Sequence, residues 1–241
     1  MWRSLRFWLH FGALMPVAVP QALHTKRTAL RLPEAAGPQH GIFDGEGEPW
    51  RLMVIGESTV AGVGVEQQTE GLAAGVAKAF AVQTGRPAHW RAHGRNGARI
   101  RDVRRDLLPD DLQQADMVLI GIGVNDTTGF SSQRHWREQL RHLVADIRRQ
   151  TQAPIGFLAL PPMHHFTALP QPLRSVIGHR AGLMDHNLRR ALAGLPGCRV
   201  LDYASDMHPR YLAADGYHPS ADGYAAIGEA VAFHLQSRFT P

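Results

Sequence analysis

Three residues of this chain have the types and the spacing that nucleophilic catalysis requires. Ser58 follows the apolar run Leu52–Ile55, and Asp215 precedes His218 within one short turn, Asp215-Gly216-Tyr217-His218. A serine hydroxyl becomes a useful nucleophile when an imidazole accepts its proton and a carboxylate fixes the tautomer of that imidazole. The sequence therefore predicts ester hydrolysis with Ser58 as nucleophile, His218 as base and Asp215 as its orienting acid. Because the base must be neutral, activity is predicted to fall at acid pH.

Two further residues are suited to stabilising the negative charge that develops on a carbonyl oxygen. Gly97 lies in the loop after the run Ala88–Ala92, and Asn125 follows the run Met117–Ile122. The backbone amides of Ser58 and Gly97, with the side-chain amide of Asn125, would form a three-donor oxyanion hole. Losing one such donor typically slows a reaction by about 10²–10³. Glycine suits position 97 because a substrate carbonyl needs close approach to the backbone.

From Arg51 onward, short apolar runs alternate with longer segments of helical periodicity. The predicted strands are Leu52–Ile55, Ala88–Ala92, Met117–Ile122, Ile155–Leu160 and Arg199–Asp202. The predicted helices lie near residues 67–84, 98–108, 132–150, 174–194 and 220–237. This alternation predicts an α/β fold, a three-layer α/β/α sandwich around a flavodoxin-like five-stranded parallel sheet of order 2-1-3-4-5. In that order the loops after the first three strands meet at one edge of the sheet.

Composition narrows the classes of partner and cofactor. The chain has 241 residues, 44% of them apolar, which suffices for a sizeable core, and its single cysteine, Cys198, excludes an internal disulfide. Its net charge of +5 comes from 26 basic and 21 acidic residues. The arginines stand beside acids, as in residues 101–106, which is typical of solvated helix surfaces rather than a nucleic-acid interface. We expect no nucleic acid, no metal and no organic cofactor.

The first part of the chain differs in composition from the rest. Two arginines precede a mostly apolar run from Phe7 to Leu23, and two basic residues follow it, an order typical of a signal peptide or a short anchor. We expect residues 1–27 to form a membrane anchor or surface segment, with a cleaved signal or a docked arm as alternatives. Residues 28–50 are predicted to be an extended arm, and residues 51–241 a hydrolase domain. A membrane-associated or exported location is favoured, with a cytoplasmic one as the alternative.

The motifs together resemble those of the SGNH (GDSL-like) hydrolase family of esterases and lipases. The matching blocks, in the family's order, are Gly56-Glu57-Ser58, Gly97, Gly123-Val124-Asn125-Asp126 and Asp215-Gly216-Tyr217-His218. The resemblance covers about residues 51–238. It implies a three-layer α/β/α fold, a triad of Ser58, His218 and Asp215, an oxyanion hole of Ser58, Gly97 and Asn125, and no cofactor. Glu57 stands where the family more usually has Asp, and it keeps the charge with one extra methylene group.

The predicted function is hydrolysis of carboxylic esters through an acyl-enzyme. Short acyl chains such as acetyl are expected, because the sequence contains no long continuous apolar lid. One alternative is a thioesterase or lysophospholipase that uses the same triad. Another is a membrane-associated binding module that has kept the fold and lost turnover. Each site residue also has a structural interpretation, since Ser58 could begin a helix, Asp215 could form an Asx-turn and Asn125 could cap a helix.

Overall fold

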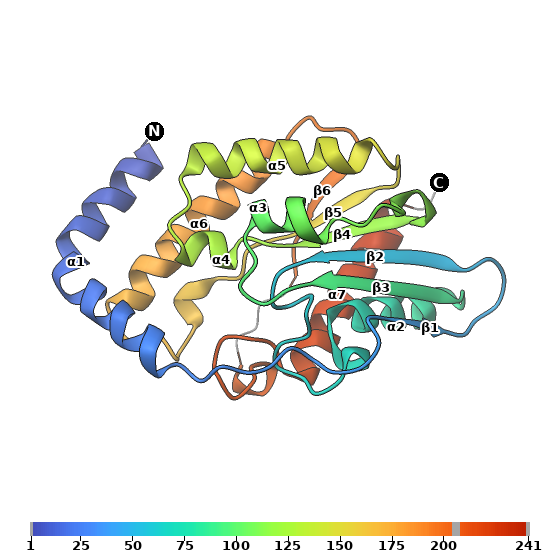
Figure 1. Cartoon of the computed structure of the whole chain (residues 1–241), viewed down its shortest axis with the longest axis horizontal. Helices are drawn as coiled ribbons and strands as arrows, with labels where there is room; N and C mark the ends of the chain where they lie inside the picture. The colour runs from blue at the N-terminus through green and yellow to red at the C-terminus, as the bar shows by residue number, and fades with distance from the viewer. Residues whose placement is uncertain (1, 204–207, 240–241) are drawn as a thin grey trace.

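The computed structural model describes residues 2–203 and 208–239, and Figure 1 shows a central sheet with helices on both sides. Six strands form one mixed sheet in the order β1-β3-β2-β4-β5-β6. Strands β2 to β6 run parallel to one another, and β1 pairs antiparallel with β3 at one edge. The strands are β1 (His40–Phe43), β2 (Trp50–Gly56), β3 (Ala88–Gly94), β4 (Met117–Gly121), β5 (Ile155–Leu158) and β6 (Cys198–Leu201).

The prediction of a five-stranded, all-parallel sheet is wrong in one respect, because a sixth strand makes the sheet mixed. The five predicted strands do run parallel to one another. The additional strand, β1, lies within residues 28–50, the segment predicted to be an extended arm. It has only four residues, none of them buried, so it lacks the apolar run that indicates a core strand. Strand β1 pairs with the outer edge of β3, whose backbone groups would otherwise have no partner strand on that side.

Helices cover the two faces of the sheet. On one face lie α2 (Leu72–Thr84) and α7 (Ala221–Phe239), and on the other lie α5 (Gln133–Arg148) and α6 (Leu173–Leu192). The short helices α3 (Ile100–Asp102) and α4 (Val124–Thr128) follow β3 and β4, respectively, along the chain. This arrangement, visible in Figure 1, is the three-layer sandwich that the alternating sequence pattern predicts.

The residues of β2 show why the core strands read as continuous apolar runs. Leu52 and Val54 point into the cluster beneath α2 and α7, whereas Met53 and Ile55 point into the cluster beneath α5 and α6. All four side chains are almost completely buried. A strand that is covered on both faces has no solvent-facing positions for polar side chains, so its sequence is a continuous apolar run. The burial of β2 on both faces shows that it lies in the middle of the sandwich.

The N-terminal segment forms the helix α1 (Trp2–Thr28), which packs against α6 outside the three layers (Figure 1). Phe7 and Ala18 are buried there, in a cluster that includes Val176 of α6. The outline of α1 bends in Figure 1, and Pro16 and Pro20 lie inside the helix. Within the described part of the chain, no helix combines the length and the apolar character needed to cross a bilayer.

Candidate active site

Ser58 lies just beyond the carboxyl end of β2, where the chain turns sharply. The backbone amides of Val60 and Ala61 both donate to the Glu57 carbonyl at 3.0 Å, and the Val63 amide donates to the Ser58 carbonyl at 3.0 Å. These bonds fix a compact turn whose first residues carry the candidate nucleophile. Ser58 is only 6% exposed, and it lines a cavity rather than an open surface.

The structure brings Ser58, His218 and Asp215 into one hydrogen-bonded chain. The Nε2 atom of His218 lies 2.9 Å from the Ser58 Oγ atom. On the other side of the ring, the Nδ1 atom of His218 lies 2.6 Å from the Asp215 Oδ2 atom. With Nδ1 protonated and donating to the carboxylate, Nε2 is free to accept the serine proton. Residues far apart in sequence therefore form the geometry that activates a serine hydroxyl.

The Asp215 carboxylate is held in its ionised form by its hydrogen bonds. Burial acts to raise the pKa of Asp215, but the hydrogen bonds from His218 and from backbone amides outweigh it, and the pKa lies below its usual value. Its Oδ1 atom accepts from the backbone amides of Tyr217 at 3.0 Å and His218 at 3.1 Å. The Asx-type turn and the contact with the imidazole are thus made by the same carboxylate, one oxygen serving each.

The loop that carries His218 is fixed against the turn that carries Ser58. Tyr224 of α7 is fully buried, and its hydroxyl donates to the Val63 carbonyl at 2.7 Å. Gly64 has a φ of +110°, and a Cβ atom there would lie 2.3 Å from the Pro219 carbonyl oxygen and 3.3 Å from the His218 Cβ atom. Glycine at position 64 therefore permits the close approach that sets the distance from serine to histidine.

Asn125 lies beside Ser58 at the start of α4, and Glu57 positions its backbone. The Glu57 carboxylate accepts from the Val124 amide at 2.8 Å and from the Asn125 amide at 2.9 Å. The Asn125 Nδ2 atom donates to the Ala98 carbonyl at 3.1 Å, which uses one of its two N–H groups. Burial raises the pKa of Glu57 to about 7, although the two backbone hydrogen bonds act in the opposite direction.

Gly97, the third predicted oxyanion donor, lies in the loop after β3 with a φ of +78°. This left-handed backbone conformation favours glycine. Asp126 ties the same loop to α4, because its buried carboxylate accepts from the Ile100 amide at 2.9 Å. Gly97 is exposed. Ser58 and Asn125 line the cavity, whereas Gly97 is not among the described residues that do. The structure therefore brings Asn125 to the cavity and leaves Gly97 at its margin.

A single cavity of about 740 Å³ contains the Ser58 and His218 side chains. Its walls come from α4, α6, α7 and, against expectation, α1, which contributes Phe11, Ala18 and Ala22. Apolar side chains make up most of the lining away from the hydroxyl and the imidazole. Cavities of about 300–1,000 Å³ can bury an entire drug-sized ligand. The site thus joins a small polar centre to a large apolar chamber.

Two features of this site depend on long-range contacts that sequence patterns do not reveal. The sequence shows that Glu57 departs from the usual Asp. Its carboxylate, however, accepts hydrogen bonds from Val124 and Asn125, which lie 67 and 68 positions further along the chain. The contribution of α1 to the cavity depends on docking against α6, which hydrogen bonds such as Leu173 N to Gln21 Oε1 at 3.1 Å support. The only sequence signal for that docking is the apolar character of the segment.

Ser58 and His218 meet beyond the carboxyl ends of the parallel strands. Open α/β sheets bind their ligands at this edge, and α/β hydrolytic enzymes share this arrangement. Residues 54–226 match the model of the GDSL-like lipase/acylhydrolase family. A GDSL-like esterase of Mycobacterium tuberculosis (strain ATCC 25618 / H37Rv) is 26% identical to this chain, over 92% of the chain and 76% of that relative. This chain belongs to the GDSL-like lipase/acylhydrolase family, and it is a hydrolase of the esterase and lipase type.

Solved structures share the fold. A lipase from a goat rumen metagenome superposes with a TM-score of 0.64 at 16% identity, over 79% of this chain and 100% of that one. An extracellular lipase from Streptomyces rimosus gives a TM-score of 0.59 at 19% identity, over 77% of this chain and 99% of that one. At these identities the likeness establishes the common α/β architecture. A catalytic triad and an oxyanion hole are typical of the family.

Proposed function

We propose that this chain hydrolyses carboxylic esters through a covalent acyl-enzyme formed on Ser58. The Ser58 Oγ atom attacks the ester carbonyl carbon while His218 Nε2 takes the hydroxyl proton. The carbon–oxygen bond to the alcohol then breaks, and the imidazolium returns its proton to the leaving alkoxide oxygen. Water repeats the sequence, with His218 accepting its proton and returning it to Ser58 as the acid leaves. Asp215 stays ionised and stabilises the imidazolium throughout.

The observation that carries this proposal is the pair of distances at His218, 2.9 Å to Ser58 Oγ and 2.6 Å to Asp215 Oδ2. Both lie within the hydrogen-bonding range that general-base catalysis needs before substrate arrives. The buried Asp215, with its lowered pKa, supports the role of an ionised partner to an imidazolium.

The Ser58 and Gly97 backbone amides and the Asn125 side chain are proposed as the oxyanion hole. Asn125 lines the cavity with Ser58, and its side chain is held by the Ala98 carbonyl and by the neighbouring Glu57 carboxylate. For Gly97 the support is indirect: its loop is anchored to α4 by Asp126, and its neighbour Asn96 lines the cavity. Substrate would have to reach the Gly97 amide from the edge of the cavity.

A fluorophosphonate probe tests the nucleophile directly. We expect the wild-type chain to be labelled at Ser58 and the Ser58→Ala variant to remain unlabelled. Thr59, the next residue and also part of the cavity lining, provides the matched control, since Thr59→Ala keeps labelling. Absence of labelling in a folded wild-type chain would instead favour the binding module that has lost turnover.

The preferred length of the acyl chain follows from the cavity rather than from the sequence. The absence of a long apolar lid in the sequence predicts short chains, but α1 supplies an apolar wall to the cavity beside Ser58. We therefore propose that p-nitrophenyl octanoate is hydrolysed faster than the acetate. If the acetate is hydrolysed faster, the prediction of short acyl chains is confirmed and the apolar cavity does not bind the acyl chain. The same apolar chamber favours a lysophospholipase or thioesterase as the second candidate function.

The proposed partner is a small acyl ester, and no nucleic-acid partner is expected. Many described arginines are paired with acids, for example Arg104 with Asp146 at 2.8 Å, which leaves less free positive charge than the sequence count implies. We also propose that the chain is membrane-associated or exported rather than cytoplasmic. Fractionation of cells that produce the full chain, followed by sizing of its N-terminus, tests this location.

A further inference from the structure

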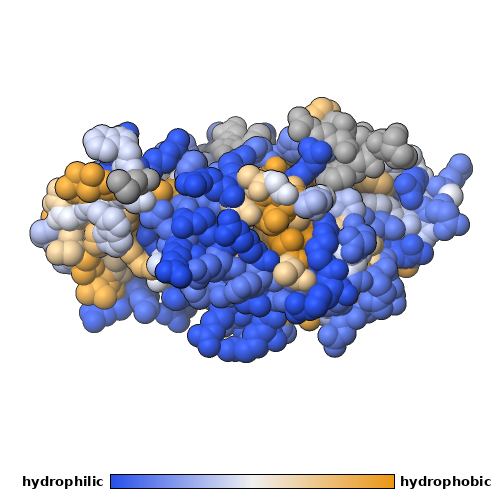
Figure 2. Space-filling model, turned by 90° about the horizontal axis from the view of Figure 1, so that it is seen from above, coloured by the Kyte–Doolittle hydropathy of each residue, from blue (hydrophilic) through white to orange (hydrophobic). Residues whose placement is uncertain are grey.

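Helix α1 carries an unusual concentration of exposed apolar side chains. Among the described residues, thirteen large hydrophobic residues are exposed, and eight of them belong to α1. These eight are Trp2, Leu5, Trp8, Leu9, Met15, Val17, Val19 and Leu23. Val19 and Leu23 also line the cavity that contains Ser58, so the outer face of α1 consists of the other six. Figure 2 shows hydrophobic surface gathered at the end of the molecule where α1 lies in Figure 1. Of the remaining five, Leu30 follows α1 directly and Phe130 packs against Phe11 of α1, whereas Ile42, Val82 and Phe233 lie elsewhere. Among the described residues, the exposed apolar side chains therefore gather on and beside α1.

The exposed face belongs to a firmly attached helix, because the opposite side of α1 is packed and hydrogen-bonded. Phe7 is fully buried against α6, and its ring centre lies 5.6 Å from the guanidinium carbon of Arg180. Gln21 holds the other half of the helix, since its Nε2 atom donates to the Gln171 carbonyl at 2.6 Å. The orientation of α1 is thereby fixed, and its outer apolar face points to solvent.

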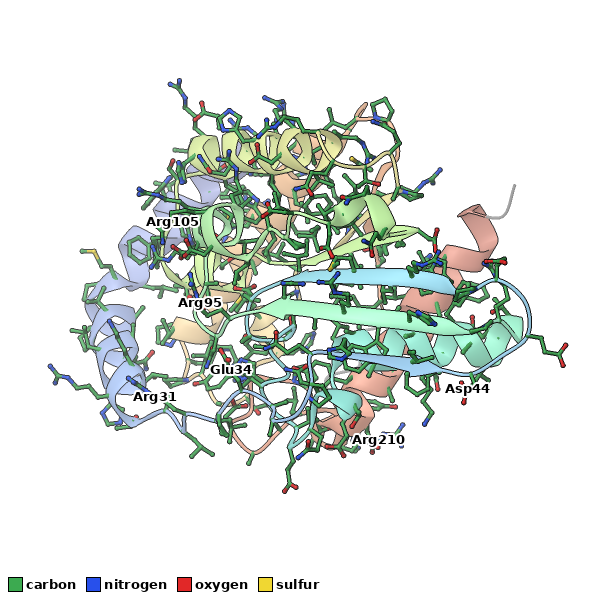
Figure 3. All side chains as sticks on the ribbon, turned by 45° about the vertical axis from the view of Figure 1, so that its right-hand side comes forward. Arg31, Glu34, Asp44, Arg95, Arg105 and Arg210 are labelled. Atoms are coloured by element: carbon green, nitrogen blue, oxygen red, sulfur yellow. The ribbon has the colours of Figure 1, made fainter. Side chains whose placement is uncertain are left out.

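The charge of this segment is uniformly positive. Arg3, Arg6, Lys26 and Arg27 are exposed at the two ends of α1, and the first acidic residue of the chain is Glu34. Figure 3 shows Glu34 on the linker after α1, near the loop of Arg95, and its carboxylate accepts from the Asn96 amide at 2.6 Å. A helix with tryptophans on an apolar face and basic residues beside it is typical of helices that lie in the interface of an anionic membrane.

We propose that the outer face of α1 docks this enzyme on an anionic lipid surface. The helix lies along that surface, with Trp2 and Trp8 at the level of the headgroups, since no described helix can cross a bilayer. The inner side of the same helix lines the cavity that contains Ser58. Docking therefore brings the apolar chamber to the lipid boundary, where an acyl ester enters it. This entry route rests on the proposed function, whereas the docking itself does not.

Tryptophan emission provides a direct measurement of docking. Of the five tryptophans, Trp50, Trp90 and Trp136 are buried in the core, and Trp2 and Trp8 are exposed on α1. Mixing the full chain with vesicles of equimolar phosphatidylcholine and phosphatidylglycerol is expected to shift the emission to shorter wavelength. The double variant Trp2→Phe, Trp8→Phe should lose the shift. A wild-type spectrum that does not change on these vesicles would overturn the proposal.

Cosedimentation with the same vesicles tests the face itself. Replacing Leu5 and Leu9 with Glu removes apolar area and adds repulsion, so partitioning is expected to fall by about tenfold or more. The matched control replaces Val82 and Phe233, which are as exposed but lie on α2 and α7, with Glu. That control should sediment with vesicles as the wild type does. An equal loss in both double variants, each shown to be folded by its thermal melt, would contradict docking through α1.

The charge requirement is tested by replacing Arg3 and Arg6 with Gln. Each basic residue near an anionic surface contributes about fivefold to binding, so about a tenfold or greater loss is expected. The matched pair Arg134→Gln and Arg149→Gln, on the exposed surface at α5, should have little effect. Equal binding to vesicles of phosphatidylcholine alone would contradict the anionic preference.

Two outcomes separate lipid docking from self-association and from turnover. If the outer face of α1 instead joins two copies of the chain, Leu5→Glu with Leu9→Glu will convert a dimer to a monomer and leave vesicle binding unchanged, which overturns the proposal. The Ser58→Ala variant should bind vesicles as tightly as the wild type. A variant that loses turnover but still binds vesicles tests the proposed chemistry alone. A variant that loses vesicle binding but still hydrolyses a soluble ester tests the docking alone.

Discussion

The carboxylate of Glu57 accepts a hydrogen bond from the backbone amide of Asn125 at 2.9 Å. The residue before the candidate nucleophile is thereby joined to the candidate oxyanion donor. Two loops that follow neighbouring strands, β2 and β4, are connected through this one buried side chain.

Shortening or neutralising Glu57 should disturb Asn125 more than it disturbs substrate binding. We expect Glu57→Gln to lower kcat by about tenfold with little change in KM. Only the carbonyl oxygen of the amide accepts, so one of the two backbone N–H groups of Val124 and Asn125 loses its acceptor. Glu57→Asp should restore part of the rate, since it retains two acceptor oxygens. Steady-state kinetics on p-nitrophenyl esters provides the measurement. Equal values of kcat in all three proteins would show that the Glu57 bridge does not position the site.

The same carboxyl group should make stability depend on pH. The pKa of Glu57 is raised in the folded chain from 4.5 to about 7. The folded state therefore binds the proton more tightly than the unfolded state, so this stabilisation is complete below pH 4.5 and is lost as pH rises through 7. The expected loss is about 3 kcal/mol. Thermal melts of wild type and Glu57→Gln between these pH values should converge at the acid end and separate at the alkaline end, with the wild type losing stability relative to the variant.

Asp215→Asn should remove the negative charge that holds the His218 ring. The rate is expected to fall by about 10³–10⁴, because the amide permits the wrong tautomer of the imidazole and no longer stabilises its cation. The wild-type rate should also decline at acid pH, because the proposed mechanism needs a neutral base. Glu57 titrates nearby, so the pH profile of Glu57→Gln serves as the control. An acid limb that disappears in that variant would assign the decline to Glu57 instead.

Replacing the proposed oxyanion donors should slow the chemical step. Asn125→Asp keeps the shape of the side chain and removes its donor, and we expect kcat to fall by about 10²–10³ with KM nearly unchanged. Gly97→Ala forces a side chain onto a residue with a φ of +78°, although no atom would crowd its Cβ, so a fall in rate reports on backbone position. A loss confined to Asn125→Asp would remove Gly97 from the proposed oxyanion hole.

Gly64 separates the effect of a close contact from that of backbone conformation alone. Gly64→Ala would press a Cβ atom against the Pro219 carbonyl, and we expect both lower stability and a rate reduced by about tenfold or more as His218 is displaced. Gly85 also has a positive φ, but open space surrounds it at the end of α2. Gly85→Ala should cost about 1 kcal/mol in unfolding free energy and leave kcat unchanged. Similar kinetics for the two variants would contradict the role given to Gly64.

The extent to which the sequence predicts this molecule depends on the range of the interactions involved. The apolar runs of β2 and β4 are recognisable because burial on both faces excludes polar residues from them. Strand β1 escapes prediction because its position depends on the free edge of β3, a partner far away in the chain. The meeting of Ser58 with His218 follows from the order of motifs, which encodes topology. The order of motifs does not predict the contacts of α1 with the cavity or the hydrogen bonds between Glu57 and Asn125. Both depend on side chains that only the complete fold brings together.

The hydroxyl and the imidazole come from opposite ends of the domain, and this separation has a consequence for biosynthesis. Ser58 leaves the ribosome early, in a turn whose local hydrogen bonds need nothing downstream. His218 arrives only with the final helix, which must settle on α2 before Tyr224 can secure the turn. On the proposed mechanism, a nascent chain stays inert toward esters until the segment that carries His218 has been synthesised and has folded onto the rest of the domain.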